Sequence, residues 1–163
     1  MAAKQHKGVE EGGIKPIAVN RKARHEYIFE EFFEAGIELR GTEVKSLRIG
    51  RVSLVESYAS VDTAGQVWLK GLNISRWEQA SCFNHDPLRA RRLLLHKHEI
   101  RRLNQRTHEK GLTLVPVRIY FKRGLIKVEL ALARGKKLYD KREAETAKAV
   151  KRDMERAMSE RGR

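Results

Sequence analysis

The chain has 163 residues, of which 35 are Lys or Arg and 21 are Asp or Glu, so its formal net charge is +14. Apolar residues make up 40%, enough for one modest core, but no apolar run approaches the roughly 20 residues that a membrane helix needs. The single cysteine, Cys82, excludes an internal disulfide and a multi-thiolate zinc site. The N-terminal residues lack the apolar segment of a secretory signal, which predicts a cytoplasmic protein. A protein this basic is typical of a polyanion binder, and the usual intracellular polyanion is nucleic acid.

The positive charge is clustered along the chain. Basic residues dominate three stretches, 15–25, 88–106 and 134–142, whereas the stretch 26–34 is acidic. Runs of charge can be no more than solvated faces of a folded domain. Because the surplus is large and clustered, we favour two or three surfaces that bind a polyanion.

The first half of the chain is predicted to alternate short strands with helical segments. The first 14 residues are polar and are expected to be disordered. Apolar runs and period-two alternation predict strands, and these cover residues 17–20, 33–40, 55–61 and 67–74. A helical turn is expected over residues 22–29, and a short helix is expected from Thr42, as its N-cap, to Gly50.

The second half carries the clearest strand pattern. Asp86 and Pro87 predict the start of a helix that runs to Lys110 and ends at Gly111. Two strands with strict alternation follow, over residues 115–121 and 126–132. Short antiparallel strands with helices between them predict a mainly β fold, a small closed or nearly closed antiparallel barrel, because closure leaves no long exposed edge.

The chain is therefore divided into a disordered start (1–14), a barrel domain (15–134) and a basic tail (135–163). The tail is rich in Ala, Glu, Lys and Arg, which favour helix. Its apolar stripe is thin, and ordering costs roughly 1–2 kcal/mol per residue. We therefore expect the tail to be disordered when free and helical on a partner.

No residue pattern predicts catalysis, a metal or a cofactor. On a helix His96 and His98 would point about 200° apart, so they could not share an ion. Cys82 and His85 have a ligand-like spacing but lack a second pair. The chain contains no phosphate-binding glycine loop and no acidic cluster typical of a two-metal nuclease.

The nucleic-acid signals are stronger. The segment from Asn20 to His25 contains groups that contact phosphate or stack on a base. A helix over residues 88–106 would present a basic face suited to a nucleic-acid backbone. Because no helix-turn-helix or zinc-finger pattern is present, structured or single-stranded RNA is favoured over a DNA groove. A general RNA-binding or ribosomal structural protein, and an RNA-processing enzyme, stay open as alternatives.

Four segments resemble the SsrA-binding protein family (small protein B): NRKARHEY (20–27), EEFFEAGIELRGTEVKSLRIGRVSLVESYA (30–59), DPLRARRLLLHKHEI (86–100) and ARGKKLYDKRE (133–143). The resemblance implies an antiparallel barrel of the oligonucleotide-binding (OB) type with about three helices and a tail that is unstructured in solution. It implies a protein that is not an enzyme and that binds the tRNA-like domain of transfer-messenger RNA. It also implies delivery of that RNA, with elongation factor Tu, to stalled ribosomes for trans-translation. The body would replace a tRNA anticodon arm, and the tail would enter the empty message channel.

The resemblance also assigns roles to individual residues. The family's RNA-contacting positions correspond to Asn20, Glu34, Leu94 and His96. The clustered charge, and not the resemblance, adds the basic residues expected to bind RNA beside them: Arg21, Lys22, Arg24, Arg89, Arg91 and Arg92. The positions expected to face the ribosome, near the decoding centre or in the tail, are His25, Gly135, Lys136, Lys137, Asp140, Lys141, Arg142 and Met158. The residues alone allow other interpretations: Glu34 as a solvent-facing strand residue, His25 as a helix-surface residue and Leu94 as a core residue.

Overall fold

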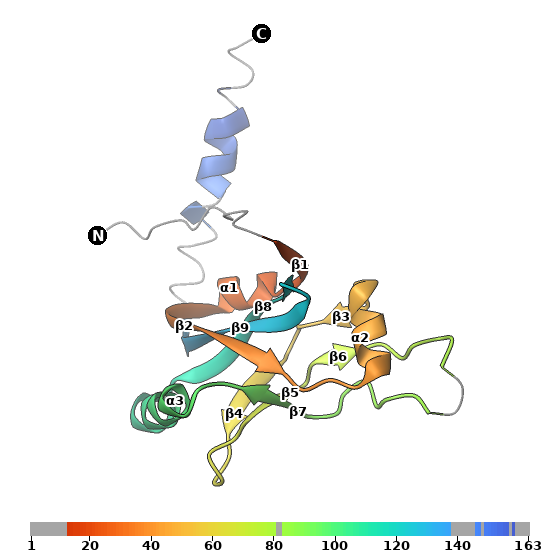
Figure 1. Ribbon diagram of the computed structural model, residues 1–163. Helices are drawn as coiled ribbons and strands as arrows, with labels where there is room; N and C mark the ends of the chain where they lie inside the picture. The colour runs from red at the N-terminus through yellow and green to blue at the C-terminus, as the bar shows by residue number, and fades with distance from the viewer. Residues whose placement is uncertain (1–12, 81–82, 138–145, 148, 157, 159–163) are drawn as a thin grey trace.

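The computed structural model describes residues 13–80, 83–137, 146–147, 149–156 and 158. The elements follow in the order β1 (Ile14–Val19), α1 (Arg21–Glu26), β2 (Tyr27–Ile37), α2 (Gly41–Arg48), β3 (Val52–Ser53), β4 (Tyr58–Val61), β5 (Val67–Lys70), β6 (Asn73–Ile74), β7 (Arg91–Leu94), α3 (Lys97–Lys110), β8 (Thr113–Lys122) and β9 (Leu125–Gly135). The predicted mainly β class with accompanying helices is confirmed (Figure 1).

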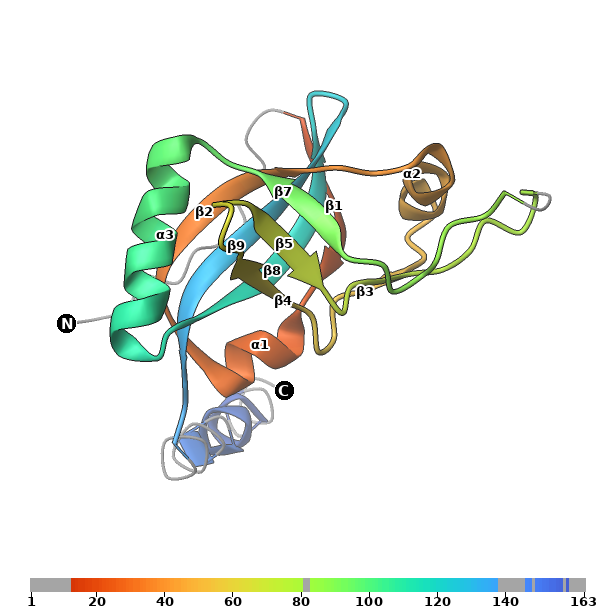
Figure 2. The same cartoon turned by 90° about the horizontal axis from the view of Figure 1, so that it is seen from below.

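The main sheet closes on itself. Its strands follow the order β8-β4-β5-β7-β2-β9, and β9 pairs again with β8. Every pairing is antiparallel. β1 lies outside this ring, where Ile14 pairs with Lys122 of β8. Figure 2 shows the ring with α1 and α3 on its outside. The expected closed arrangement and the expected edge strand at the start of the domain are both confirmed.

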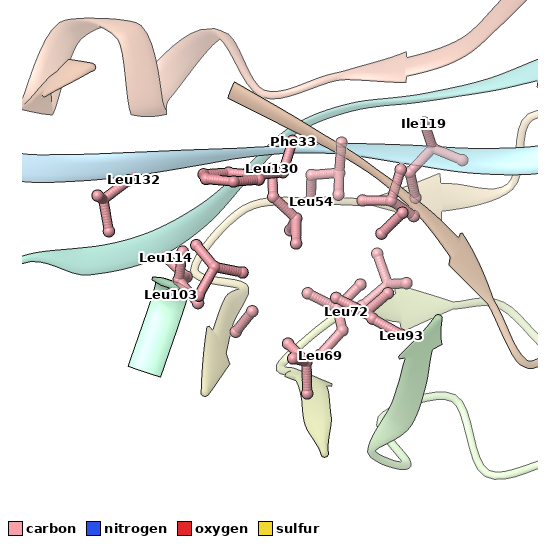
Figure 3. Close-up of a cluster of buried hydrophobic side chains, with 14 of the residues drawn as sticks. Phe33, Leu54, Leu69, Leu72, Leu93, Leu103, Leu114, Ile119, Leu130 and Leu132 are labelled. Atoms are coloured by element: carbon pink, nitrogen blue, oxygen red, sulfur yellow. The ribbon is translucent and has the colours of Figure 1, made fainter. Parts of the chain in front are cut away.

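The core fills the ring (Figure 3). Alternation along β2 buries Phe33 and Ala35 and leaves Phe32 and Glu34 outside. Leucines from the other strands meet them, among them Leu69, Leu93 and Leu130. Burying one such side chain contributes about 1.5–3 kcal/mol. Because one face of each strand is committed to this core, the opposite face of β2 presents Glu34 to solvent, whereas α1 covers part of the outer face of β8 and β9.

α3 covers one end of the ring. Leu103 is fully buried in the core, and Ile100 packs against it. Two arginines attach the helix to β2: Arg102 pairs with Glu31 at 3.0 Å, and the half-buried Arg106 pairs with Glu30 at 2.9 Å. Gly111 ends α3 in the left-handed conformation at φ 60°, as the sequence predicted.

The prediction that a helix begins at Asp86 is wrong. Residues 91–94 form the strand β7, and α3 begins only at Lys97. The start of α3 is fixed locally: Glu99 accepts a hydrogen bond from the backbone N–H of His96 at 2.9 Å, the carboxylate half of a capping box. The side chains of β7 alternate, with Arg91 and Leu93 buried and Leu94 exposed. The pattern was missed because a fully buried arginine does not look like a core residue.

The prediction that Thr42 is the N-cap of α2 is also wrong. The N-cap of α2 is Arg40, whose backbone N–H donates to Glu43 at 2.6 Å. Thr42 instead bonds the buried ring of His85, with 2.9 Å between Oγ1 and Nδ1. Its hydroxyl therefore ties α2 to the segment that precedes β7.

Several element boundaries differ from those predicted. Tyr27 already belongs to β2, so the helix expected over residues 22–29 ends at Glu26 and the strand expected over residues 33–40 starts earlier and ends at Ile37. The strand expected over residues 55–61 is interrupted by a turn in which Glu56 has φ 63°. The hairpin of β8 and β9 is confirmed almost as predicted.

The described residues of the tail at 146–147, 149–156 and 158 are helical and exposed. The expected disorder of the free tail, and that of residues 1–12, lies outside what the structure describes. Cys82, Asp140, Lys141 and Arg142 also lie outside the described residues. Within the described part of the chain, no helix is long and apolar enough to cross a membrane.

Candidate nucleic-acid interface

Glu34 lies on the outer face of the ring, held by two donors from β8. Its Oε2 accepts a hydrogen bond from the Tyr120 hydroxyl at 2.6 Å and from the Lys122 ammonium at 2.8 Å. The bonds from Lys122 and Tyr120 lower the pKa of the Glu34 carboxyl. Burial, reinforced by the carboxylate, raises the pKa of Tyr120 well above its usual value. The lowered pKa of Glu34 and the raised pKa of Tyr120 favour a carboxylate and a neutral phenol at this site.

An apolar hollow lies on the same side of the ring. It has a volume of about 390 Å³ and is lined by Gly36, Leu94, Leu125, Lys127 and Arg48, among others. Leu94 is 51% exposed and Leu125 is 62% exposed, so both present apolar surface to solvent at the hollow. The interpretation of Leu94 as a core residue is therefore wrong, and Leu93 takes that place.

Gly36 keeps this hollow open. A Cβ atom added there would lie 3.3 Å from the Cβ of Leu94, closer than ordinary van der Waals contact. Gly36 and Leu94 also pair in the β2–β7 ladder. The position of the exposed leucine thus depends on the absence of a side chain at residue 36.

The hollow and Glu34 form one continuous surface. Gly36 follows Glu34 by two positions on the same strand, so both face outward. Lys127 pairs in register with Gly36 and with Tyr120, and its charge also lowers the pKa of Glu34. We call this region, made by Glu34, Gly36, Leu94, Tyr120, Lys122, Leu125 and Lys127, the Glu34–Leu94 surface.

His96 lies next to this surface, two positions after Leu94, at the start of α3. Its ring stacks on that of His98, with centroids 5.6 Å apart and an interplanar angle of 14°. The expectation that the two rings diverge is wrong, because His96 is the extended N-cap residue and not part of the helix. In the part of the chain that the structure describes, no group of three or more His, Cys, Asp or Glu residues could hold a metal ion.

Asn20 is buried, and its side chain is used within the protein. Its Oδ1 accepts from the backbone N–H of Ala23 at 3.0 Å, which caps α1. Its Nδ2 donates to the carbonyl oxygens of Leu54 at 3.1 Å and Pro116 at 3.2 Å. The side chain of Asn20 therefore holds α1, the segment before β4 and β8 together.

Arg89 and Arg91 are likewise committed to the fold. Both guanidinium groups bond the Glu43 carboxylate, at 2.5 Å from Arg89 and 2.8 Å from Arg91. Arg91 and Glu43 are fully buried. Burial raises the pKa of Glu43, but the bonds from Arg89, Arg40 and Arg91 outweigh it, so the pKa is lowered overall. Arg92 is half-buried and pairs at the surface with Glu38 at 2.9 Å.

The basic residues of α1 form a second, separate region. Arg21, Lys22, Arg24 and His25 are exposed, whereas Ala23 is buried against β8. Gly135 ends β9 beside the first residue of β2, where it pairs with Tyr27. The space around Gly135 is open, so nothing within the described structure requires a glycine there. Two further tail residues that were expected to face the ribosome, Lys137 and Met158, are exposed.

Arginines from other elements of the fold pair with acidic residues of the stretch 26–34. Glu30 accepts from Arg106 at 2.9 Å and from Arg134 at 2.7 Å. Glu31 pairs with Arg102. The acidity of residues 26–34 thus gives no repulsive face, because strands and helices distant in sequence supply the counter-charges.

Sequence reasoning missed Gly36, Tyr120, Lys122 and Lys127. The predicted strand ends at residue 121, although period-two alternation from Arg118 through Tyr120 places Lys122 on the outer face of β8. Extending the alternation by one step would have found it. The role of Gly36 carries no signal in the sequence, because it depends on pairing with Leu94.

The closed β ring, with a cationic and partly apolar outer face, defines a class of compact basic proteins built to bind a folded polyanion. The family model described as SmpB protein matches residues 17–160, and the chain belongs to this family. The SsrA-binding protein of Pelotomaculum thermopropionicum is 54% identical over 150 residues, which cover 92% of this chain and 97% of the relative. That of Ruminiclostridium cellulolyticum is 56% identical over 147 residues, covering 90% of this chain and 95% of the relative.

A solved structure described as "tmRNA-SmpB: a journey to the center of the bacterial ribosome" contains a similar chain. The two superpose with a TM-score of 0.63 at 54% sequence identity, covering 74% of this chain and 85% of that chain. The family that the sequence motifs indicated is thereby confirmed.

Proposed function

We propose that the protein binds transfer-messenger RNA through the Glu34–Leu94 surface and acts with it in trans-translation on the ribosome. Membership of the SmpB family and the similarity to SsrA-binding proteins support the RNA partner and the process. We further propose that it is not an enzyme, that it contacts the tRNA-like domain of that RNA and that it works in the cytoplasm.

One observation carries the assignment of the surface: the fold brings Glu34 and Leu94, sixty positions apart in the sequence, to one face. Gly36 connects them, since it follows Glu34 on β2 and pairs with Leu94 on β7. A carboxylate accepts hydrogen bonds from base amino groups, and apolar side chains pack on bases and sugars. Lys122 and Lys127 supply attraction to phosphate.

Glu34 is suited to reading a base. The hydrogen bonds from Tyr120 and Lys122 both end on its Oε2. The other oxygen, Oε1, is our candidate acceptor for an amino or imino group of the RNA. Because Lys122 neutralises the charge locally, the carboxylate adds specificity without strong repulsion of phosphate.

The α1 region is the candidate ribosome-facing side. Tyr27 and Gly36 mark opposite ends of β2, and at roughly 3.3 Å per residue the strand between them spans up to about 30 Å. The RNA surface and the start of the tail therefore lie at different ends of the body. This separation allows the protein to hold the RNA at one end while His25, Gly135 and the tail face the decoding centre and message channel at the other.

The test is competition binding at about 150 mM salt, with the tRNA-like domain against an unrelated hairpin of equal length. We expect preference for the tRNA-like domain and loss of roughly ten- to a hundredfold in affinity for Leu94→Asp, with a smaller loss for Glu34→Gln. Leu88→Asp is the matched control, because Leu88 is 58% exposed and does not line the hollow. Equal affinity for both RNAs would favour the general RNA-binding alternative.

The enzyme alternative needs its own measurement. Purified protein incubated with the tRNA-like domain and Mg²⁺ is expected to leave the RNA intact and unmodified. Any protein-dependent turnover, detected by gel and mass spectrometry, contradicts the non-enzymatic role.

A further inference from the structure

The first tail residue after β9, Lys136, is bonded to the end of α1. The backbone N–H of Lys136 donates to the carbonyl oxygen of Glu26 at 2.8 Å. The ammonium Nζ of the same lysine donates to the carbonyl oxygen of Arg24 at 3.3 Å, across 112 positions of sequence. Lys136 therefore provides two donors to the last turn of α1, a helix that lies near the start of the domain in the sequence.

These donors meet a need of the helix. The last turn of any α-helix leaves carbonyl groups without intrahelical partners, and a cation there is favoured by the helix dipole. In α1 the backbone N–H of Tyr27 bonds the carbonyl of Ala23, and Lys136 bonds those of Arg24 and Glu26. A helix of six residues is too short to persist alone. The contacts that support it from outside its own turns include the burial of Ala23, the Asn20 cap and the two bonds from Lys136.

We propose that Lys136 is a positioning residue that joins the tail's point of departure to α1. The exposed basic residues of α1, Arg21, Arg24 and His25, then meet a large partner in one fixed arrangement with the first residues of the tail. This inference rests on the proposed function. It gives Lys136 a role inside the body, in place of the direct ribosome contact that the family resemblance implies.

The side chain and the backbone of Lys136 can be tested separately. Every residue except proline retains the backbone N–H bond, so Lys136→Met removes only the bond from Nζ and the charge. Lys136→Arg keeps a cationic donor and is the rescue variant. Lys151→Met is a matched control, because Lys151 is an exposed tail lysine whose ion pair, to Glu155 at 4.0 Å, is local.

Amide hydrogen exchange on the full-length protein without RNA tests the contact. Lys136→Met is expected to speed exchange in residues 21–27 by roughly three- to tenfold and to leave β4 and β5 unchanged. Lys136→Arg and Lys151→Met are expected to match the original protein in this segment. Unchanged exchange of α1 in Lys136→Met overturns the proposal.

Peptide tagging on stalled ribosomes, measured beside affinity for the tRNA-like domain, tests the consequence. Lys136→Met is expected to tag several-fold more slowly while its RNA affinity stays within about twofold, and Lys136→Arg is expected to restore tagging. Parallel loss of RNA affinity, or no rescue by arginine despite normal exchange of α1, overturns the positioning role. Failure of the proposed function is distinguishable, because then the unmodified protein itself shows no preference for the tRNA-like domain.

Discussion

Glu43 on α2 and Glu34 on β2 show that the same charged group can have a structural role or a binding role. Glu43 is fully buried between Arg89 and Arg91, and its bonds hold α2 against the segment leading into β7. Glu34 is also bonded by two side chains, the Lys122 ammonium and the Tyr120 hydroxyl. Its side chain is nevertheless 39% exposed on the outer face of the ring. The first carboxylate is enclosed by its partners and stabilises the fold. The second is held in place while still facing solvent, which is the arrangement that recognition requires.

The largest effect is expected when the buried cluster is broken. Glu43→Gln leaves the fully buried Arg91 without its counter-charge, and removing one partner of a buried ion pair costs about 3–5 kcal/mol. Urea denaturation at neutral pH should show this loss in the free energy of unfolding. Glu38→Gln is the exposed control, since Glu38 pairs with Arg92 at the surface and should change stability by less than about 1 kcal/mol. Equal losses in both variants would contradict the distinction.

A smaller effect, on binding, is expected when the hollow is narrowed. Gly36→Val places a branched side chain against Leu94, whose Cβ lies only 3.3 Å from the position of the new Cβ. We expect affinity for the tRNA-like domain to fall by roughly tenfold, or about 1.4 kcal/mol, by displacement of the exposed leucine. Isothermal titration calorimetry checks this, with circular dichroism to verify the fold. Wild-type affinity in a folded variant would show that the hollow is not part of the interface.

The smallest effect is the contribution of Glu34 to stability, and it depends on pH. The bonds from Lys122 and Tyr120 lower the pKa of Glu34 below its ordinary value of 4.5. A lowered pKa in the folded state means that the stabilisation is present above pH 4.5 and is lost as the pH falls through the folded value. Because the pair is exposed, Glu34→Gln should cost only about 0.2–1 kcal/mol at pH 7.

Urea denaturation at pH 7 and pH 3 measures that dependence. The difference between the original protein and Glu34→Gln should shrink at the lower pH. A difference that is constant, or that grows in acid, would show that the carboxylate is not stabilised by these donors.

Features that depend on residues close together in the sequence could be predicted, whereas features that depend on distant partners could not. The hairpin of β8 and β9 was predicted because its alternation is local and both strands are long. Gly111 was predicted as a helix end for the same reason. The burial of Arg91 could not be predicted, since its partner Glu43 lies 48 positions away. Asn20 is similar, because its acceptors on Leu54 and Pro116 lie 34 and 96 positions away.

The candidate surface was predicted only in part. Glu34 and Leu94 were named through the family motifs, but their juxtaposition comes from the order of strands in the ring. Arg89 and Arg91 were assigned to RNA binding from charge alone, and charge does not show which arginines become enclosed by a carboxylate. Within the leucine triplet, the register of β7 decides that Leu93 enters the core and Leu94 faces outward.

The closure of the ring has a consequence for synthesis. β1 pairs with β8, and the last strand, β9, completes the ring by pairing with both β8 and β2. Translation proceeds from the N-terminus, so the early strands must wait with unpaired edges until Gly135 has left the exit tunnel. Pairings this distant also slow folding. A nascent chain of this protein that stalls before β9 is complete therefore cannot close its ring.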